Sequence, residues 1–127
     1  MMKVIVAGSR TITLQSIVDQ AIIRAFNYWM KNDQDNWQYY TQPEIVSGGA
    51  QGVDFLGEKY ALKHKLKCTV FPANWELHGR KAGILRNREM AFYADRLIAI
   101  WDGKSRGTLN MIQEMNLLNK LVYVQCP

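Results

Sequence analysis

The stretch of sequence that decides the fold is EIVSGGAQGVDFLGEKYA, residues 44–61. A short apolar segment leads into a loop with glycine at positions 48, 49 and 52, and a helical pattern starts directly afterwards. This pattern predicts a helix over residues 51–65 with one face toward the core, formed by Val53, Leu56, Gly57, Tyr60 and Ala61. A strand that enters a helix through a glycine turn is typical of parallel α/β proteins.

Similar units precede and follow this stretch. Apolar segments predict strands at residues 3–7, 44–46, 68–71, 96–101 and 121–124. Helical patterns lie between them, with an apolar stripe over residues 14–29 that includes Leu14 and Tyr28, and further helices at about residues 82–94 and 107–119. The alternation predicts a Rossmann-like three-layer α/β/α fold, with a mostly parallel five-stranded sheet and helices on both faces, as a single domain over residues 1–127.

The composition excludes several classes of protein. With 48% apolar and 21% charged residues, the chain is typical of a globular domain. It lacks an apolar run near the roughly 20 residues that cross a bilayer, and Met1 leads into a strand rather than a signal peptide, so we expect a cytoplasmic protein without membrane contact. Cys68 and Cys126 lack the spacing of a metal site, so neither a metal nor a cofactor is predicted.

The net charge of +5 has two explanations. The excess lies in residues 44–106, which hold eleven Lys/Arg against seven Asp/Glu. Such a field suits a phosphate-bearing partner, and solvated surface lysines are the alternative explanation.

The loop at residues 47–52 is a candidate phosphate site. Ligands of parallel α/β sheets bind at the carboxyl ends of the strands, where this loop lies. Gly48 and Gly49 allow close backbone approach, Gly52 allows tight entry into the helix, and Ser47 adds a hydroxyl. The helix N-terminus that follows attracts anions. A plain tight turn is the alternative interpretation.

Two further strand-to-helix loops have the same character. Gly8, Ser9 and Arg10 follow the first strand, and Arg10 can grip a phosphate with two hydrogen bonds. The loop after the fourth strand supplies Asp102, Gly103, Lys104, Ser105, Gly107 and Thr108. Neither loop matches the P-loop pattern, so a magnesium-dependent triphosphatase is not predicted.

The third helix adds the densest positive charge. Arg80 and Lys81 precede it and Arg86 lies in its first turns, so all three are expected at the binding edge, with Arg88 in solvent. Asn87 falls on the sheet-facing arc, where it either bonds neighbouring backbone or reads a ribose or base.

The carboxylates of the second helix are also ambiguous. Asp54 could hydrogen-bond a ribose hydroxyl, orient the glycine loop or cap the helix, while Glu58 is expected to meet water.

The motifs VIVAGSRT, IVSGGAQGVD, AGILRNREM and ADRLIAIWDGKSRGT resemble the SLOG superfamily, named for the Smf/DprA and Lonely Guy groups, and in particular its small YspA/YpsA-related branch. The resemblance implies a fold that binds nucleotides or molecules derived from them. Lonely Guy enzymes, which are phosphoribohydrolases, carry a catalytic glutamate in their P-G-G-x-G-T-x-x-E motif. That position falls on Met111 here, with the Gly-Thr pair at Gly107 and Thr108. The departure argues for binding over hydrolysis, although Asp54 or Glu89 could substitute as a catalytic carboxylate.

Three functions follow from the resemblance and the residues. The first is a sensor or sequestering protein for a nucleotide-derived signal, such as a cyclic or ADP-ribose-type molecule in bacterial or phage defence. The second is a nucleoside-monophosphate N-glycosidase. The third is binding of single-stranded nucleic acid, which the DprA likeness and the basic charge permit and the lack of a regular aromatic platform disfavours. A homo-oligomer, dimer or tetramer, is also expected, because a short chain offers little pocket depth.

Residues 31–43 read as a polar excursion between the first helix and the second strand. Its aromatic residues, Trp37, Tyr39 and Tyr40, could form a stacking lid or a subunit contact, or pack back onto the domain.

Overall fold

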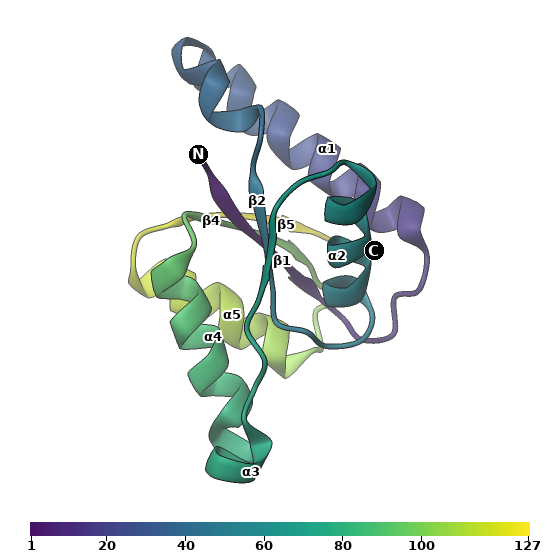
Figure 1. The fold of residues 1–127 in the computed structure, drawn as a ribbon, viewed down its shortest axis with the longest axis vertical. Helices are drawn as coiled ribbons and strands as arrows, with labels where there is room; N and C mark the ends of the chain where they lie inside the picture. Colours follow the sequence, from purple (N-terminus) through teal and green to yellow (C-terminus); the bar gives the residue numbers. More distant parts are fainter.

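The protein is built around one parallel β-sheet (Figure 1). The computed structural model describes residues 1–127, with strands β1 (Lys3–Gly8), β2 (Glu44–Ser47), β3 (Cys68–Val70), β4 (Arg96–Ile100) and β5 (Leu121–Gln125). The strand order is β3-β2-β1-β4-β5, and every neighbouring pair is parallel. This confirms the predicted Rossmann-like sheet. Because the order reverses at β1, the loops after β1 and β4 diverge to opposite faces and leave a crevice between them.

Helices cover both faces of the sheet (Figure 1). Helices α1 (Gln15–Lys31) and α2 (Val53–Lys63) pack on one face, where Val4, Val6 and Ile98 point. Helices α4 (Ala82–Tyr93) and α5 (Arg106–Leu117) pack on the other, where the alternate residues Ile5 and Leu97 point. Because β1, β2 and β4 are covered on both sides, they are buried along nearly their whole length, which explains their continuous apolar sequences.

The predicted stripe of the first helix is wrong at two positions. Leu14 is extended and precedes the helix, and its side chain is exposed. Tyr28 lies inside α1 but is also exposed, and its ring contacts that of Tyr123 on the edge strand β5. Both residues therefore lie outside the apolar core of this face.

The polar excursion at residues 31–43 packs back onto the domain around the side chain of Arg96. It forms a 3-10 helix, η1 (Gln34–Tyr40), in which Tyr39 and Tyr40 lie against the guanidinium of Arg96, with ring centroids at 5.5 and 5.2 Å. Trp29 of α1 lies 5.0 Å from the same group. Arg96 is the first residue of β4, so η1 lies at the amino ends of the strands, opposite their carboxyl ends. A lid over a ligand at those ends is therefore excluded for this segment.

Two short elements that the sequence did not separate connect β3 to α4. They are α3 (Trp75–His78), capped by the Asn74 side chain, which accepts a hydrogen bond from the N–H of Leu77 at 3.1 Å, and the 3-10 helix η2 (Gly79–Lys81). Together they project beyond the sheet at the lower end of Figure 1.

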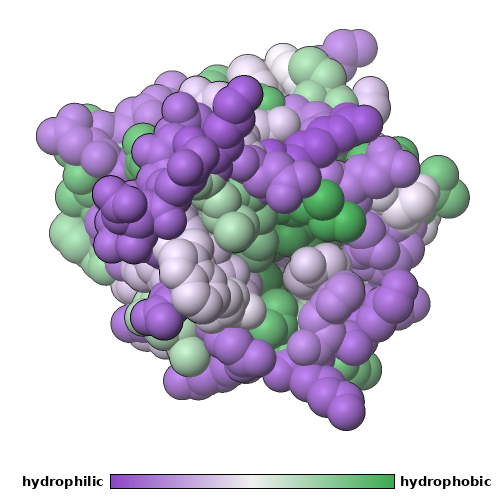
Figure 2. Space-filling view, turned by 90° about the horizontal axis from the view of Figure 1, so that it is seen from above, coloured by the Kyte–Doolittle hydropathy of each residue, from purple (hydrophilic) through white to green (hydrophobic).

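The surface agrees with the charged composition. On the face seen in Figure 2, hydrophilic side chains predominate and hydrophobic ones form small separate areas. None of the helices has the length and apolar character that a membrane span requires.

Candidate functional site

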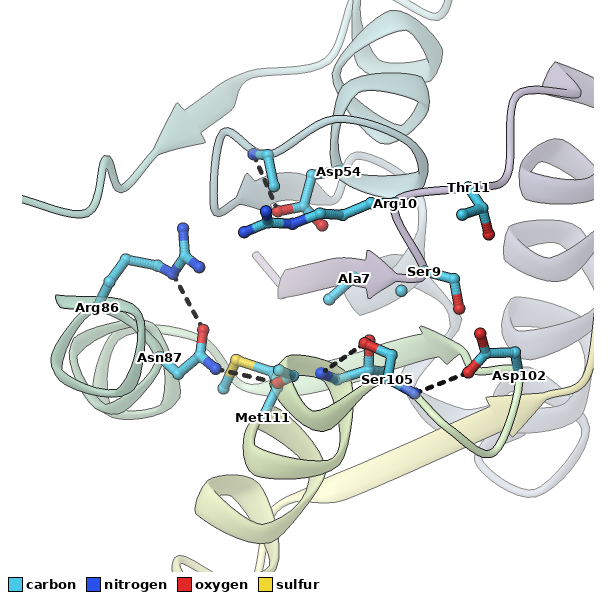
Figure 3. A pocket seen from close by; sticks show the side chains of 14 residues that line it. Ala7, Ser9, Arg10, Thr11, Asp54, Arg86, Asn87, Asp102, Ser105 and Met111 are labelled. Carbon is cyan, nitrogen blue, oxygen red and sulfur yellow. Dashed lines mark hydrogen bonds between the residues drawn. The ribbon is translucent and has the colours of Figure 1, made fainter. Parts of the chain in front are cut away.

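A cleft of about 320 Å³ opens at the carboxyl ends of β1 and β4, where the strand order reverses (Figure 3). Its size falls within the range of small-molecule sites, ~300–1,000 Å³. Its lining comes from four separate segments of the chain and consists of Ala7, Gly8, Ser9, Arg10, Thr11, Ala50, Asp54, Arg86, Asn87, Asp102, Ser105, Gly107, Thr108 and Met111.

Two arginines from different elements reach into this cleft. Arg10 extends from the loop after β1, and Arg86 approaches from α4 on the other side (Figure 3). Arg86 is held in place because its Nη1 donates to the carbonyl oxygen of Gly48 and its Nε donates to Oδ1 of Asn87 at 3.0 Å. Burial lowers the pKa of Arg86 and the nearby Asp54 opposes that shift, yet a guanidinium stays charged at any physiological pH.

Glycine is required where the loops meet. A Cβ on Gly52 would lie 2.4 Å from the carbonyl oxygen of Ser9, and its φ of +74° is in the region that favours glycine. A Cβ on Gly48 would lie 2.8 Å from both Arg86 Nη1 and Asp54 Oδ2. These two positions let the β2 loop pack against the β1 loop and against the arginine.

Asp54 is the buried carboxylate of the cleft. It is only 6% exposed, and its Oδ2 accepts a hydrogen bond from the N–H of Ala50 at 3.3 Å, an arrangement that orients the glycine loop. Burial raises the pKa of Asp54 to about 6, against the opposing effects of the Ala50 N–H and of Arg86. The expectation for Glu58 is wrong: it does not simply face water, because its carboxylate accepts a hydrogen bond from Ser47 Oγ at 2.6 Å.

Asn87 connects the two helices of one face. Its Oδ1 accepts from Arg86, and its Nδ2 donates to the carbonyl oxygen of Gly107 at 3.2 Å and to Oδ1 of Asn110 at 2.9 Å. Both amide hydrogens are therefore used inside the protein. The geometry favours the first alternative for this residue, an amide that fixes its neighbours.

The loop after β4 is organised by its own side chains. Asp102 Oδ1 accepts from the backbone N–H groups of Lys104 and Ser105, both at 2.8 Å, and these bonds lower the pKa of Asp102. Ser105 caps α5 by accepting from the N–H of Thr108 at 3.4 Å. The start of α5 thus lines the cleft and brings the positive end of its dipole there.

Ser9 leaves a buried hydroxyl without a partner in the cleft. It is 2% exposed, and its Oγ makes no hydrogen bond in the structure, although it lies close enough to the Asp102 carboxylate to contribute to the lowered pKa of Asp102. An unpaired buried hydroxyl is costly and marks a place where a ligand atom would be stabilised.

A second chamber of about 450 Å³ adjoins the cleft, and we call it the side chamber. The two share Arg10, Ala50 and Arg86. The remaining lining of the side chamber is Gly48, Gly49, Gln51, Val70, Pro72, Ala73 and Trp75.

The residues that the sequence indicated divide into three groups. Ten of them line the cleft: Gly8, Ser9, Arg10, Asp54, Arg86, Asn87, Asp102, Ser105, Gly107 and Thr108. Gly48 and Gly49 line the side chamber. The rest line neither: Ser47, Gly52, Arg80, Lys81, Gly103 and Lys104. Ser47 and Gly52 pack inside the loop, and η2 carries Arg80 and Lys81 onto the exposed surface.

Several lining residues were missed by sequence reasoning. Ala7, Thr11 and Ala50 complete the cleft, and Trp75 and Pro72 belong to the side chamber. Met111, which the sequence placed at the Lonely Guy glutamate position, also lines the cleft. Met111 is buried in the cleft wall, and Glu89, the other candidate carboxylate, is exposed outside it. No group of three His, Cys, Asp or Glu side chains is arranged to hold a metal ion.

Comparison with known proteins gives matches in sequence and in structure. The model of the family described as YspA, cpYpsA-related SLOG matches residues 2–78. The Gene 61 protein of Mycobacterium phage D29 is 40% identical over 76 residues, which cover 55% of this chain and 61% of the phage protein.

Two solved structures of DNA processing protein A (DprA) share the fold. The one from Streptococcus pneumoniae has a TM-score of 0.71 at 18% identity, over 98% of this chain and 50% of that chain. The one from Helicobacter pylori, described for its single-stranded DNA binding mode, has a TM-score of 0.65 at 22% identity, over 97% and 64%. The chain thus spans about half to two thirds of the length of these proteins.

Proposed function

Because this chain belongs to the YspA, cpYpsA-related SLOG family, we propose that its cleft binds a nucleotide or a nucleotide-derived molecule through a phosphate and holds it without cleaving it. The observation that carries the proposal is the convergence of Arg10 and Arg86 on one cleft that also receives the start of α5. Proteins commonly bind phosphate with guanidinium groups and with helix N-termini. The unpaired Ser9 hydroxyl supplies a further donor.

The phosphate position in this proposal differs from the one that the glycines suggested. The space beside the Cα of Gly52 is occupied by the backbone of Ser9 and Arg10. The N–H of Val53, the first residue of α2, donates to the Ser9 carbonyl at 3.3 Å. The start of α2 is therefore engaged with the β1 loop. The phosphate is assigned to the space between Arg10, Arg86 and the start of α5.

The state of the carboxylates in the cleft favours binding of the nucleotide over hydrolysis of its glycosidic bond. Hydrolysis of a glycosidic bond needs a carboxylate beside the sugar. The position of the catalytic glutamate of the Lonely Guy enzymes falls on Met111, and Asp54, the buried carboxylate of the cleft, is engaged in orienting the glycine loop. A sensor or a protein that sequesters a nucleotide signal is the role that this chemistry supports, and a relative from a phage is compatible with sequestration in phage defence.

Single-stranded DNA is the second candidate ligand. The H. pylori DprA structure concerns single-stranded DNA binding, and the likeness to it is one of fold. The net charge of +5 and the exposed cations Arg80, Lys81 and Lys104 around the site would suit a phosphodiester backbone.

Calorimetric titration of the purified protein with AMP, ADP-ribose, cyclic dinucleotides and a decadeoxynucleotide tests the proposal. We expect binding of at least one small nucleotide, weakened by Arg10→Gln, and no free base after long incubation when the mixture is analysed by chromatography. Release of base would identify an N-glycosidase. Failure of every small nucleotide, with strongly salt-dependent binding of the decamer alone, would favour the second candidate.

A further inference from the structure

The cleft and the side chamber are two compartments with one common wall. Arg10 and Arg86 line both of them, with Ala50 between the two loops. An anion bound by these arginines would therefore border the cleft on one side and the side chamber on the other. Each compartment falls within the ~300–1,000 Å³ of ligand sites.

The two compartments differ in their chemistry. The cleft presents polar groups, among them Ser9, Asn87 and Ser105. The side chamber presents bare backbone at Gly48 and Gly49, and apolar side chains at Val70, Pro72 and Trp75. The bare glycine backbone and the indole ring offer surfaces on which a planar group can stack, next to the polar Arg10, Gln51 and Arg86 of the same chamber.

Trp75 is placed to serve as a stacking surface. Its side chain is 53% exposed although it lines the chamber, and its far ring edge lies 3.5 Å from the position that a Cβ on Gly83 would take. One edge is thus seated on α4, and the rest of the ring remains open. Stacking on an exposed aromatic ring is how proteins bind bases without regard to sequence.

We propose that the site binds two nucleosides joined by a phosphate. The phosphate lies on Arg10 and Arg86, one base lies in the cleft, and the second base stacks on Trp75 in the side chamber. This rests on the proposed function, whose phosphate position it shares. A mononucleotide would fill one compartment and leave the apolar wall of the other in water. The ligand is therefore a dinucleotide unit, either a free dinucleotide or one step of a single strand.

The test compares a mononucleotide with the dinucleotide that adds a second base, and uses ADP-ribose to control for the added sugar and phosphate. Affinities are measured by calorimetry at fixed salt for AMP, for the linear dinucleotide pApA and for ADP-ribose, with the thymine counterparts TMP and pTpT in parallel. We expect pApA or pTpT to bind about tenfold or more tightly than the matching mononucleotide, as stacking of one base on an aromatic ring supplies. ADP-ribose has a second phosphate and a second sugar but no second base, so it should not show the full gain.

Variants of Trp75 assign the gain to the side chamber. Trp75→Leu keeps an apolar side chain against Gly83 and should remove the dinucleotide gain while leaving mononucleotide affinity unchanged. Trp75→Phe keeps a stacking ring and should retain most of the gain. Trp37→Ala is the matched control, since Trp37 is exposed to the same degree, 54%, but lies in η1 at the opposite edge of the sheet. Thermal unfolding of each variant confirms that it is folded.

The outcomes separate this inference from the proposed function. Binding of mononucleotides with no gain for the dinucleotides overturns the inference alone. So does a loss of mononucleotide affinity in Trp75→Leu equal to the dinucleotide loss, because the side chamber would then be the first base site. Absence of binding by all of these nucleotides overturns both. A decadeoxynucleotide that binds more tightly per dinucleotide step than pTpT, with strong salt dependence, identifies a strand as the source, and equal affinity identifies a free dinucleotide.

Discussion

Arg86 donates a hydrogen bond from Nη1 to the carbonyl oxygen of Gly48, and this bond ties α4 to the loop that follows β2. The two residues are 38 positions apart in the chain, Arg86 in helix α4 and Gly48 in the loop between β2 and α2. The absence of a side chain at Gly48 is what allows the approach, since a Cβ there would meet the same nitrogen at 2.8 Å. The arginine is therefore held before any ligand arrives, which reduces the entropy that binding must overcome.

Replacing Arg86 should weaken ligand binding and stability together. Arg86→Gln removes one of the two guanidinium groups of the common wall, and we expect AMP affinity to fall about tenfold or more, as the loss of a charged hydrogen bond does. The lost bond to Gly48 should also lower the free energy of unfolding by about 1–3 kcal/mol. Calorimetry and urea unfolding measure the two effects.

Arg88→Gln is the matched control for this change. Arg88 lies on the same helix with an exposed side chain, paired with Glu114 at 3.3 Å. Its replacement should leave AMP affinity unchanged, while stability should fall by more than a surface ion pair contributes, because the largely buried Glu114 carboxylate loses its cation. Equal loss of affinity in both variants would show that general positive charge, rather than the placed guanidinium, attracts the ligand.

Ligand affinity should depend on pH through Asp54. Its pKa of about 6 means that the carboxylate is charged at pH 7.5 and repels a neighbouring phosphate, and it is largely neutral below pH 5.5. We therefore expect affinity for the methyl ester of AMP, whose phosphate keeps a single charge over this range, to rise as the pH falls from 7.5 to 5.5. In Asp54→Asn the affinity should be high throughout and nearly independent of pH. A wild-type profile that is flat, or that rises toward alkaline pH, would refute this role.

The same carboxylate should destabilise the free protein above its pKa. Asp54 has an ordinary pKa of 3.8 that is raised to about 6 in the fold, so the folded state binds more protons than the unfolded state between these values. Stability contributed by the protonated form is therefore present below pH 3.8 and is lost as the pH rises through 6. At 1.36 kcal/mol per pKa unit, the loss is about 3 kcal/mol.

Asp54→Asn isolates this effect, because the amide oxygen can still accept from the Ala50 N–H. The variant should be more stable than the wild type at pH 7.5 and nearly equal to it at pH 4, as measured by urea unfolding. A variant that is less stable than the wild type at pH 7.5 would contradict this, because it would mean that the charged carboxylate stabilises the folded state.

Gly52 should tolerate no side chain. Gly52→Ala places a Cβ against the Ser9 carbonyl and holds alanine at a φ of +74°, so we expect a loss of more than about 2 kcal/mol in the free energy of unfolding. Gly107→Ala is the control, because Gly107 lies in α5 with open space around its Cα, and alanine there should be neutral or stabilising by about 0.5 kcal/mol. Equal effects at both positions would contradict the close packing of the two loops.

The sheet and four of its helices could be predicted because local pattern decides them. The covered strands are apolar throughout, and the glycine loop marks the start of α2 close to its observed position at Val53. Arg10 and Arg86 could be placed at the binding edge because parallel topology alone brings their segments there.

The rest depends on contacts between distant residues. The exposure of Arg80 and Lys81 follows from α3 and η2, and the one local sign of α3 was Asn74 at its cap. The bonds of Asn87 to Gly107 and Asn110 join helices whose relative position no local pattern gives. Gly48 and Gly49 of the side chamber were predicted as binding residues, whereas Trp75 gave no periodic signal and was not singled out, although a tryptophan in a loop beside basic residues was a usable hint.

Trp29, Tyr39 and Tyr40 enclose Arg96 at the end of the sheet that lies away from the ligand loops. This cluster anchors the longest connection of the fold at one end of the sheet, while the ligand loops occupy the other end. Substitutions around the cleft can therefore change which ligand is chosen without loosening the anchor. A scaffold divided in this way can evolve new ligand preferences while it keeps its architecture.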